Sequence, residues 1–272
     1  MPAVSVVIPT FNRKRFLVQA LESVQGQTFT DFEIIVVDDG SSDGTGERIA
    51  GFAGVRVIRQ ENRGVSSARN AGIASSSGEL IAFLDSDDLW KPEKLACQVA
   101  FHREHPRARI SQTEEVWIRN GRRANPKKKH RKHGGWIFRE CLPLCIVSPS
   151  AVMMNRVLFG EVGLFDESLP ACEDYDMWLR VASRYPVHLI PEPLVVKRGG
   201  HPDQLSSSVP ALDRYRIRAL EKALGDGSLK PEDRDAALDE LERKCRIYAE
   251  GCLKRGRHGE ASLYAGLPER YK

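Results

Sequence analysis

The sequence has no long hydrophobic run, which argues against a membrane-spanning protein. None of its 272 residues lie in an apolar stretch of about 20 residues, the length that crosses a bilayer as a helix. No signal peptide precedes the first apolar segment, at residues 4–8, so we expect a cytoplasmic protein. Peripheral contact with the inner face of a membrane is compatible with that expectation.

The chain also lacks the cysteine spacing of disulfide scaffolds and zinc sites. Its six cysteines include no Cys-x-x-Cys pair, and no histidine has zinc-finger spacing to them. The net charge is only +4, from 41 basic and 37 acidic residues, which gives no sign of a nucleic-acid partner. A hydrophobic content of 41% is that of a globular protein with one large domain or two modest ones.

Strand and helix patterns alternate over the N-terminal part of the chain. Short β-branched runs predict four strands, at residues 4–8, 33–37, 55–58 and 80–84. Helical spacing or composition predicts three helices, at residues 16–24, 66–74 and 91–105. This alternation favours βαβ units and therefore an α/β fold with a mostly parallel sheet.

The rest of the chain is less regular. Residues 106–135 break the pattern, and apolar segments return at 145–154 and 187–196. After Pro210 the composition becomes helical, and residues 245–253 and 261–265 predict a helical hairpin. We therefore expect three regions: residues 1–110, residues 111–205 and a helical C-terminal extension at 206–272.

Polar and acidic residues follow three of the predicted strands, at residues 9–12, 38–42 and 85–88. Parallel sheets bind ligands outside the carboxyl ends of their strands, so we expect these clusters at one edge. Carboxylates at the mouth of a buried strand, such as Asp85 and Asp87, need a cation among them. Mg²⁺ and Mn²⁺ prefer oxygen ligands, so the motif predicts a metal for a phosphate-bearing substrate. A solvated turn that caps the next helix is the alternative.

A basic run occupies the irregular segment. Nine Lys or Arg and no Asp or Glu lie between Arg119 and Arg139, with the densest part at residues 127–133. We expect this part to be an exposed, mobile loop. Two interpretations stay open: a solvated loop without further role, or a contact for an anionic acceptor or an anionic membrane surface.

Five motifs, in this order along the chain, resemble those of family 2 glycosyltransferases. The resemblance covers about residues 3–205 and implies a GT-A fold, in which residues 1–110 bind the nucleotide-sugar and residues 111–205 bind the acceptor and supply the catalytic base. It also implies transfer of a sugar from a nucleotide-diphosphate donor to an acceptor hydroxyl with inversion, usually with Mn²⁺ or Mg²⁺. The five motifs are residues 6–12, 36–41, 62–70, 85–88 and 173–180.

The resemblance places donor-binding residues in the N-terminal half. Asp39 matches the family's base-recognising aspartate, and a carboxylate can accept the N3–H of uracil, so we expect a UDP-sugar. Pro9, Thr10 and Asn12 would frame the same base. Arg69 would pair with Asp39 or reach the donor; a purely structural ion pair is its alternative.

The Asp85–Asp88 cluster would serve the ribose and the metal. The resemblance makes Asp87 the direct metal ligand and Asp85, beside Ser86, a contact for the ribose or a metal-bound water. We expect Asp88 to cap a helix that begins at Leu89. His201 would approach the metal or the diphosphate, and an imidazole ligand suits Mn²⁺ better than Mg²⁺.

The acidic motif at 173–180 would supply the general base. Asp174 is our first choice, since inversion by direct displacement requires a carboxylate that deprotonates the acceptor hydroxyl. Glu173 and Asp176 are the competitors. If the following residues are helical, Asp174 and Trp178 share one face while Asp176 points elsewhere, and Trp178 and Leu179 pack in the core.

Two other functions stay open. A nucleotide-sugar pyrophosphorylase shares related architecture, but those enzymes carry a Gly-rich, basic phosphate loop where this chain has residues 9–12. A non-catalytic sugar-nucleotide-binding or scaffold protein is the second, and the presence of Asp87 and Asp174 argues against it. The expected partners are a nucleotide-sugar donor and a glycan, glycolipid or lipid-linked acceptor.

Overall fold

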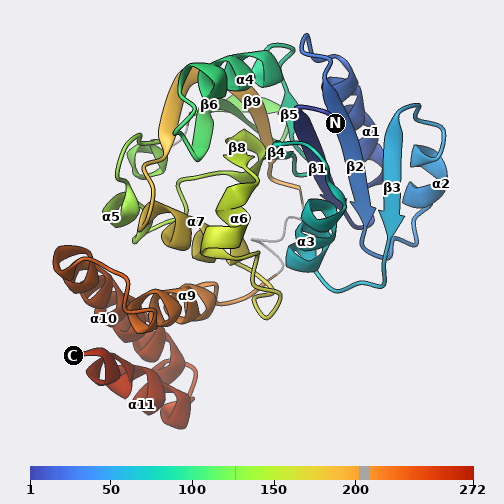
Figure 1. Cartoon of the computed structure of the whole chain (residues 1–272). Coiled ribbons are helices and arrows are strands. Elements are labelled where there is room, and N and C mark those ends of the chain that lie inside the picture. Colours follow the sequence, from blue (N-terminus) through green and yellow to red (C-terminus); the bar gives the residue numbers. More distant parts are fainter. Residues whose placement is uncertain (126, 202–208) are drawn as a thin grey trace.

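The computed structural model describes residues 1–125, 127–201 and 209–272 (Figure 1). The described strands form one sheet in the order β3-β2-β1-β4-β8-β6-β9-β5, and β7 pairs with β6 at its side. Helices flank the sheet, as the α/β expectation requires. The strands are β1 (Val4–Thr10), β2 (Phe32–Asp38), β3 (Val55–Arg59), β4 (Leu80–Phe83), β5 (Leu89–Trp90), β6 (Ile110–Arg119), β7 (Arg122–Ala124), β8 (Val152–Asn155) and β9 (His188–Gly199).

The N-terminal half has the predicted parallel arrangement. Strand β1 pairs in parallel with β2 and with β4, and β2 pairs in parallel with β3. The remaining strands are mixed, since β8 runs antiparallel to β4 and β6 while β9 runs parallel to β6. The carboxyl ends of β1, β2 and β4 therefore meet at one edge, as we expected of the polar clusters that follow them.

Alternate residues of β1 supply the two faces of the sheet. Val6 and Ile8 pack with the buried residues of α1 (Lys14–Gln25), whereas Val7 packs with Ile73 of α3 (Val65–Ser75) on the other face. A Cβ at Gly72 would collide with the side chain of Val7, so this glycine lets α3 approach the strand. The other helices of this half are α2 (Thr45–Ile49) and α4 (Lys94–Glu104).

Strand β6 corrects the expectation that residues 106–135 lack regular structure. Ten residues, Ile110–Arg119, form this strand, although its centre is polar. Ser111 and Gln112 are fully buried and hydrogen-bonded: Ser111 Oγ accepts from Gln98 Nε2 at 3.0 Å, and Gln112 Nε2 donates to the carbonyl of His133 at 3.0 Å. Because the buried polar side chains of this strand are satisfied by hydrogen bonds, the strand has no apolar run, and its sequence does not predict a strand.

The segment after β4 also differs from the expectation. Leu89 and Trp90 form strand β5, which pairs antiparallel with β9, and the helix begins only at Lys94. Asp88 is therefore not a helix cap. Its carboxylate is 2% exposed, accepts the hydroxyl of Ser150 at 2.7 Å and accepts the backbone N–H of Arg198 at 2.9 Å. It holds β9 beside the Asp85–Asp88 cluster.

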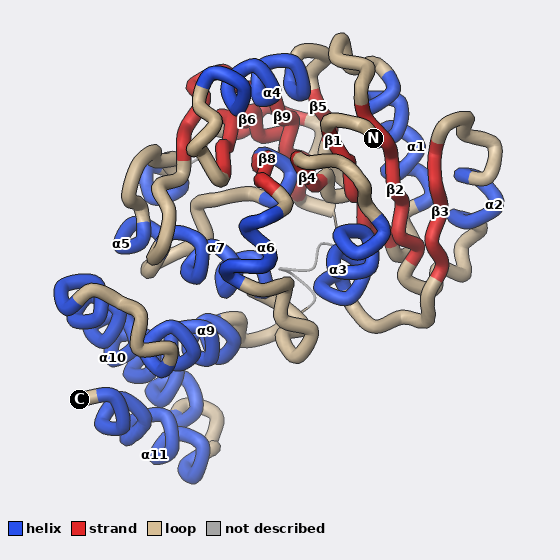
Figure 2. The backbone as a smooth tube through the Cα atoms, in the orientation of Figure 1, coloured by secondary structure: helices blue, strands red, loops and turns tan. Residues whose placement is uncertain are grey.

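The second half and the C-terminal helices share one hydrophobic core. Trp178 of α7 (Glu173–Ala182), Leu220 of α9 (Asp213–Gly225) and Leu241 of α10 (Pro231–Leu253) belong to it. Helix α9 packs against α7, and α10 and α11 form the predicted hairpin (Figures 1 and 2). The remaining helices are α5 (Phe138–Cys141), α6 (Val157–Val162) and α11 (His258–Gly266).

The predicted division into 1–110, 111–205 and 206–272 stays a prediction, and its second boundary lies outside the described residues. Among the residues that the structure covers, no helix combines the length and the apolar character needed to cross a bilayer.

Candidate functional site

A cleft of about 1210 Å³ lies at the carboxyl ends of β1, β2 and β4 and extends to the start of α7. Nearly all site residues predicted from the sequence line it, so the fold brings together segments more than 160 positions apart. The predicted residues that line it are Pro9, Thr10, Asn12, Asp39, Arg69, Asp85, Ser86, Asp87, Glu173 and Asp174. His201 does not line the cleft, but it contacts Asp87, which does.

Asp39 is fixed at the end of the cleft formed by β1 and β2. Its side chain is 3% exposed. Oδ1 accepts hydrogen bonds from Gln60 Nε2 at 2.7 Å and from the backbone N–H of Arg63 at 2.9 Å, and Oδ2 accepts the N–H of Gly64 at 2.9 Å. These donors orient the carboxylate ahead of any ligand. The expected alternative pairing of Asp39 with Arg69 is wrong.

The turn after β1 closes the same end of the cleft. Asn12 has a left-handed backbone, with φ of 51°, and its Oδ1 accepts the N–H of Ser42 at 2.8 Å. Its own N–H donates to Ser41 Oγ at 2.9 Å. Asn12 therefore joins the first and second polar clusters, and Thr10 lies buried beside them at the end of β1.

Arg69 links the two halves of the cleft. One terminal nitrogen donates to Asp85 Oδ1 at 2.7 Å and the other to Glu173 Oε1 at 2.6 Å. Burial works against the charge of Arg69, but the two carboxylates raise its pKa further above the ordinary value. The buried guanidinium is thus a fixed cation between the Asp85–Asp88 cluster and the acidic motif of α7.

Asp87 and His201 form the metal-binding candidate. Oδ2 of Asp87 lies 2.9 Å from Nε2 of His201 and 2.9 Å from a terminal nitrogen of Arg13. A carboxylate oxygen and an imidazole nitrogen that converge at this distance fit Mn²⁺, which takes both ligand types. Within the described ranges no cluster of three or more His, Cys, Asp or Glu side chains forms a cage for a metal ion. Phosphate oxygens and water would have to complete the coordination.

Asp174 lies at the first turn of α7 and faces the cleft. Its Oδ1 accepts the N–H of Tyr175 at 2.7 Å, and the thiol of Cys145 donates to Oδ2 at 3.3 Å. Unlike its two acidic neighbours, Asp174 is only partly buried and has no cation bound to it in the described parts of the chain. A carboxylate that is held in place but not neutralised is suited to accept a proton.

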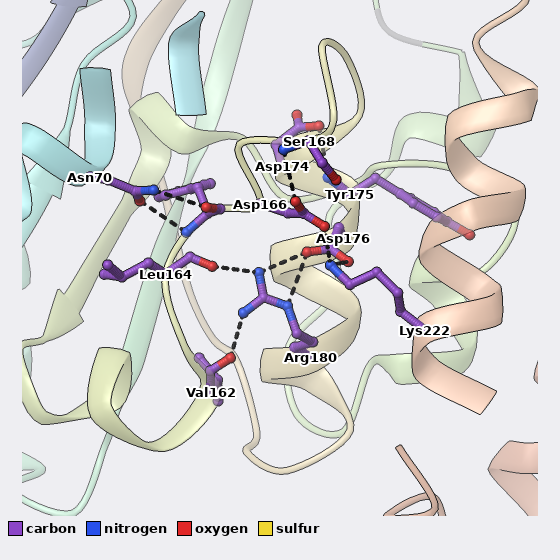
Figure 3. A network of polar contacts seen from close by, with 11 residues as sticks. Asn70, Val162, Leu164, Asp166, Ser168, Asp174, Tyr175, Asp176, Arg180 and Lys222 are labelled. Carbon is purple, nitrogen blue, oxygen red and sulfur yellow. Dashed lines mark hydrogen bonds and ion pairs between the residues drawn. The ribbon is translucent and has the colours of Figure 1, made fainter. Parts of the chain in front are cut away.

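The competitors Glu173 and Asp176 are both tied to cations. Glu173 is 4% exposed and bound to Arg69, and burial together with the charge of Asp174 raises its pKa to about 7. Asp176 binds Arg180 at 2.7 Å and Lys222 at 2.6 Å, on the side of α7 that faces α9 (Figure 3). Arg180 in turn donates to the carbonyls of Val162 and Leu164 (Figure 3). Asp176 therefore anchors α7, and Trp178 and Leu179 are core residues, as expected.

The basic run is less exposed than expected. Residues 128–130 form a short 3₁₀ turn, and Lys132 is 4% exposed. The Nζ of Lys132 lies 3.3 Å from Glu115 Oε2 and donates a hydrogen bond to the amide oxygen Oε1 of Gln112 at 3.2 Å. We expected Lys132 to lie in a mobile loop, but it is buried, because it pairs with the buried carboxylate of Glu115 on β6. Lys127, Lys128 and Arg131 are exposed, as expected.

Arg13, Lys197 and Trp117 are among the cleft residues that sequence reasoning missed. Arg13 follows the first motif directly, and its position beside Asn12 is the signal that could have found it. Lys197 donates to Ser148 Oγ at 3.2 Å; burial opposes its charge, but Glu115, Asp88 and Asp85 raise its pKa. Trp117 and Lys197 lie on adjacent strands, β6 and β9, whose pairing the sequence did not reveal.

Comparison with solved structures shows the fold. The chain is similar to Staphylococcus aureus TarS 1-349 in complex with UDP-GlcNAc, with a TM-score of 0.69, 16% identity, and coverage of 98% of this chain and 91% of that one. It is also similar to the mannosyltransferase PcManGT from Pyrobaculum calidifontis in complex with GDP-Man and Mn²⁺, with a TM-score of 0.64, 18% identity, and coverage of 98% and 86%.

Sequence comparison shows the family. The model described as glycosyl transferase family 2 matches residues 5–163. An uncharacterized glycosyltransferase of Rickettsia bellii is 36% identical over 184 residues, which are 66% of this chain but only 26% of that protein. The uncharacterized glycosyltransferase YwdF of Bacillus subtilis is 31% identical over 250 residues, 89% of this chain and 92% of YwdF. The chain therefore belongs to glycosyl transferase family 2 and has the GT-A fold of that family's solved relatives.

Proposed function

We propose that this protein transfers a sugar from a nucleotide-diphosphate donor to an acceptor hydroxyl, with inversion at the anomeric carbon. The observation that carries the proposal is one cleft that holds Asp39, Asp87 and Asp174 together. A base-recognising carboxylate, a metal-binding carboxylate and an unneutralised carboxylate are the three groups that such a transfer requires. Family membership favours transfer over the pyrophosphorylase alternative.

The donor in this proposal is a UDP-sugar. A carboxylate offers roughly four lone-pair positions, and Asp39 uses three of them for Gln60, Arg63 and Gly64. The remaining position suits the single N3–H of uracil. The complex of TarS with UDP-GlcNAc supports a uridine donor, whereas the complex of PcManGT with GDP-Man makes a guanine donor the alternative to test.

The divalent cation in this proposal is held by Asp87 and His201, with Mn²⁺ favoured by the imidazole. When bound, it would offset the negative charge that develops on the departing diphosphate. Arg13, which contacts the same carboxylate oxygen, stays beside the diphosphate as a fixed cation. Asp85, held by Arg69, and the adjacent Ser86 are left to contact the ribose.

Asp174 is the general base of the proposed reaction. In a direct displacement the acceptor oxygen attacks the anomeric carbon on the face opposite the diphosphate, and its proton passes to Asp174. The hydrogen bond from Tyr175 N–H fixes Oδ1, which leaves Oδ2, beside the weak thiol donor of Cys145, as the proton acceptor. Glu173, bound to Arg69, positions the helix rather than accepting the proton.

A panel of nucleotides tests donor and metal together. UDP and UDP-sugars should raise the thermal midpoint more than GDP or GDP-sugars, and only with Mn²⁺ or Mg²⁺ present, because a ligand of the folded state adds to stability. Asp39→Ala should remove the preference for uridine, and Asp87→Ala should remove the metal dependence.

The matched control is Glu167→Ala, which removes a more exposed cleft carboxylate that binds Arg63 and Asn70. This variant should leave the preference for uridine and the metal dependence unchanged. Equal stabilisation with and without metal would reject the metal assignment, and preference for guanine would reject the uridine assignment. Binding of nucleotide-sugars without any turnover, across acceptor classes, would favour the non-catalytic alternative.

A further inference from the structure

A second, smaller pocket of about 260 Å³ adjoins the cleft beside β6. Its lining is basic, since four cations outnumber two carboxylates: Lys127, Lys128, Arg131 and Lys132 against Glu114 and Glu115. The two hollows share Glu115, Trp117 and His130 as a common wall. The small pocket is therefore a side chamber of the cleft and not a separate feature of the surface.

Of the two carboxylates in the side chamber, Glu115 is already matched by cations. Glu115 is 7% exposed at its side chain, lies 3.3 Å from Lys132 Nζ and accepts the indole N–H of Trp117 at 2.8 Å. Burial opposes its ionisation, but Lys132 and Lys197 hold the pKa of Glu115 below its ordinary value. In contrast, Lys127, Lys128 and Arg131 form no ion pair within the described part of the chain. The chamber thus has uncompensated positive charge at its rim.

An aromatic wall separates the chamber from the cleft. The rings of Trp117 and His130 are 5.2 Å apart between centroids, with an interplanar angle of 55°. Burial and the neighbouring lysines lower the pKa of His130, which favours the neutral form of the ring. An indole face beside an imidazole presents an apolar surface of the kind that packs against the C–H face of a sugar ring.

The chamber lies on the acceptor side of the cleft. Lys197 Nζ is 5.9 Å from the Trp117 ring centroid and reaches Ser148, in the segment whose Cys145 contacts Asp174. The wall of the chamber is thus connected, through neighbouring side chains, to the proposed base. The nucleotide end, at Asp39 and Gly64, is formed by other segments of the chain.

We propose that this side chamber binds an anionic group, a carboxylate or a phosphate, carried by the acceptor, while the adjoining acceptor sugar packs on Trp117. The inference rests on the proposed function and adds the chemical class of the acceptor. Lys127, Lys128 and Arg131 contact the anion, and the buried Lys132–Glu115 pair holds the chamber open beneath it. An acceptor without negative charge would leave these cations unpaired and bind more weakly.

The test uses the full chain, first saturated with UDP and the diamagnetic ion Mg²⁺ so that the donor site cannot take up the probe. Methyl β-D-glucuronide, glycerol 3-phosphate and neutral methyl β-D-glucoside are then titrated, with binding followed by NMR line broadening of the probe. We expect the anionic probes to bind and the glucoside to bind roughly tenfold or more weakly, the effect of one charge-assisted hydrogen bond. Comparison of the two anions distinguishes a carboxylate acceptor from a phosphate acceptor.

Matched variants locate the binding. The double variant Lys128→Ala/Arg131→Ala should weaken the anionic probes by roughly tenfold, and more at low salt than at high salt. Arg122→Ala/Arg123→Ala removes the same charge from exposed residues of β7 that do not line the chamber, and should change nothing. Trp117→Leu should weaken the glucuronide but not glycerol 3-phosphate.

Equal binding of neutral and anionic probes, or equal losses in the two double variants, would overturn the inference. UDP affinity, measured in the same samples before the probe is added, should be the same in all variants. If the wild-type chain did not bind UDP at all, the proposed function would be contradicted. Failure of the proposed function can therefore be distinguished from failure of the inference about the side chamber.

Discussion

Arg69 is the residue on which the charges of the cleft depend. It is buried, and it binds one carboxylate from each half, Asp85 and Glu173. Removing one partner of a buried pair leaves the other charge uncompensated, which destabilises a protein far more than loss of a surface pair. Arg69 therefore has a structural role, because it holds Asp85 and Glu173 in place. A structural ion pair was one of the alternatives that the sequence left open.

Glu173 provides a prediction about pH. The folded state raises its pKa from 4.5 to about 7, so between these values the folded chain binds more protons than the unfolded chain. The stability of wild type relative to Glu173→Gln should therefore fall as pH rises through this range. Urea unfolding at about pH 5 and about pH 7.5 measures the difference. A difference that stays constant or grows with pH would contradict the assignment.

Single residues of the cleft differ in how far the sequence reveals them. Asp39, Asp87 and Asp174 follow strand ends or open a helix within motifs, and the fold brings all three to one cleft. The partners of Arg69 and the burial of Lys132 depend on contacts between segments distant in sequence, such as Lys132 with Glu115 of β6. No local pattern encodes which cation meets which carboxylate, so these pairings could not be predicted.

At the scale of elements, strand β6 and helix α4 show where local patterns fail. The buried face of β6 is polar, and its partners Gln98 and His102 come from α4. Because these groups satisfy one another, the strand needs no apolar run and its sequence resembles a loop. The start of α4 was misplaced for a related reason: Leu89 and Trp90 pair with β9, which is remote in sequence.

Helix α4 also carries an unusual buried charge. Lys94 is fully buried, with its Nζ 3.3 Å from the carbonyl of Val152 and 3.7 Å from the centroid of the Trp90 ring. No carboxylate pairs with it in the described ranges. Burial lowers the pKa of Lys94 well below 10.5, so between that lowered value and pH 10.5 the unfolded chain binds more protons than the folded chain.

We expect Lys94→Met to stabilise the fold by about 1–3 kcal/mol at pH 7, because an apolar chain of similar length avoids the burial of an amine. The gain should shrink as pH rises towards 10.5, since wild type becomes more stable over that range. Thermal unfolding across pH measures it, and Lys129→Met, at an exposed position, is the control. A loss of stability at pH 7 would show that the cation–π contact with Trp90 outweighs desolvation.

At the scale of the whole molecule, the C-terminal helices complete the core of the half that contains α7. Trp178, Tyr175 and Leu220 share one core, and Lys222 of α9 binds Asp176 of α7 (Figure 3). The amphipathic composition after Pro210 predicted helices but not the surface they cover. Docking of α9 against α7 supports the helix that presents Asp174, which gives the extension a structural role in the site.

This shared core predicts a single unfolding transition. Leu220→Ala should destabilise the protein by about 2–5 kcal/mol, because the residue is fully buried in the core that α7, α9 and α10 share. Tryptophan fluorescence and helical circular dichroism should report the same midpoint in wild type and variant. Leu263→Ala, at a side chain 55% exposed, should have little effect. An earlier transition seen only by circular dichroism would mean that the C-terminal helices melt independently.

The central claim, that the cleft performs transfer with Asp174 as base, is tested most directly by Asp174→Asn. The variant keeps the shape of the side chain but cannot accept the proton. Release of UDP from the bound UDP-sugar, with acceptor present, should fall by about 10²–10⁴-fold. The dissociation constant for UDP and Mn²⁺, measured by calorimetry, should stay within about threefold of wild type. UDP release at a rate close to that of wild type, with binding unchanged, would contradict the account.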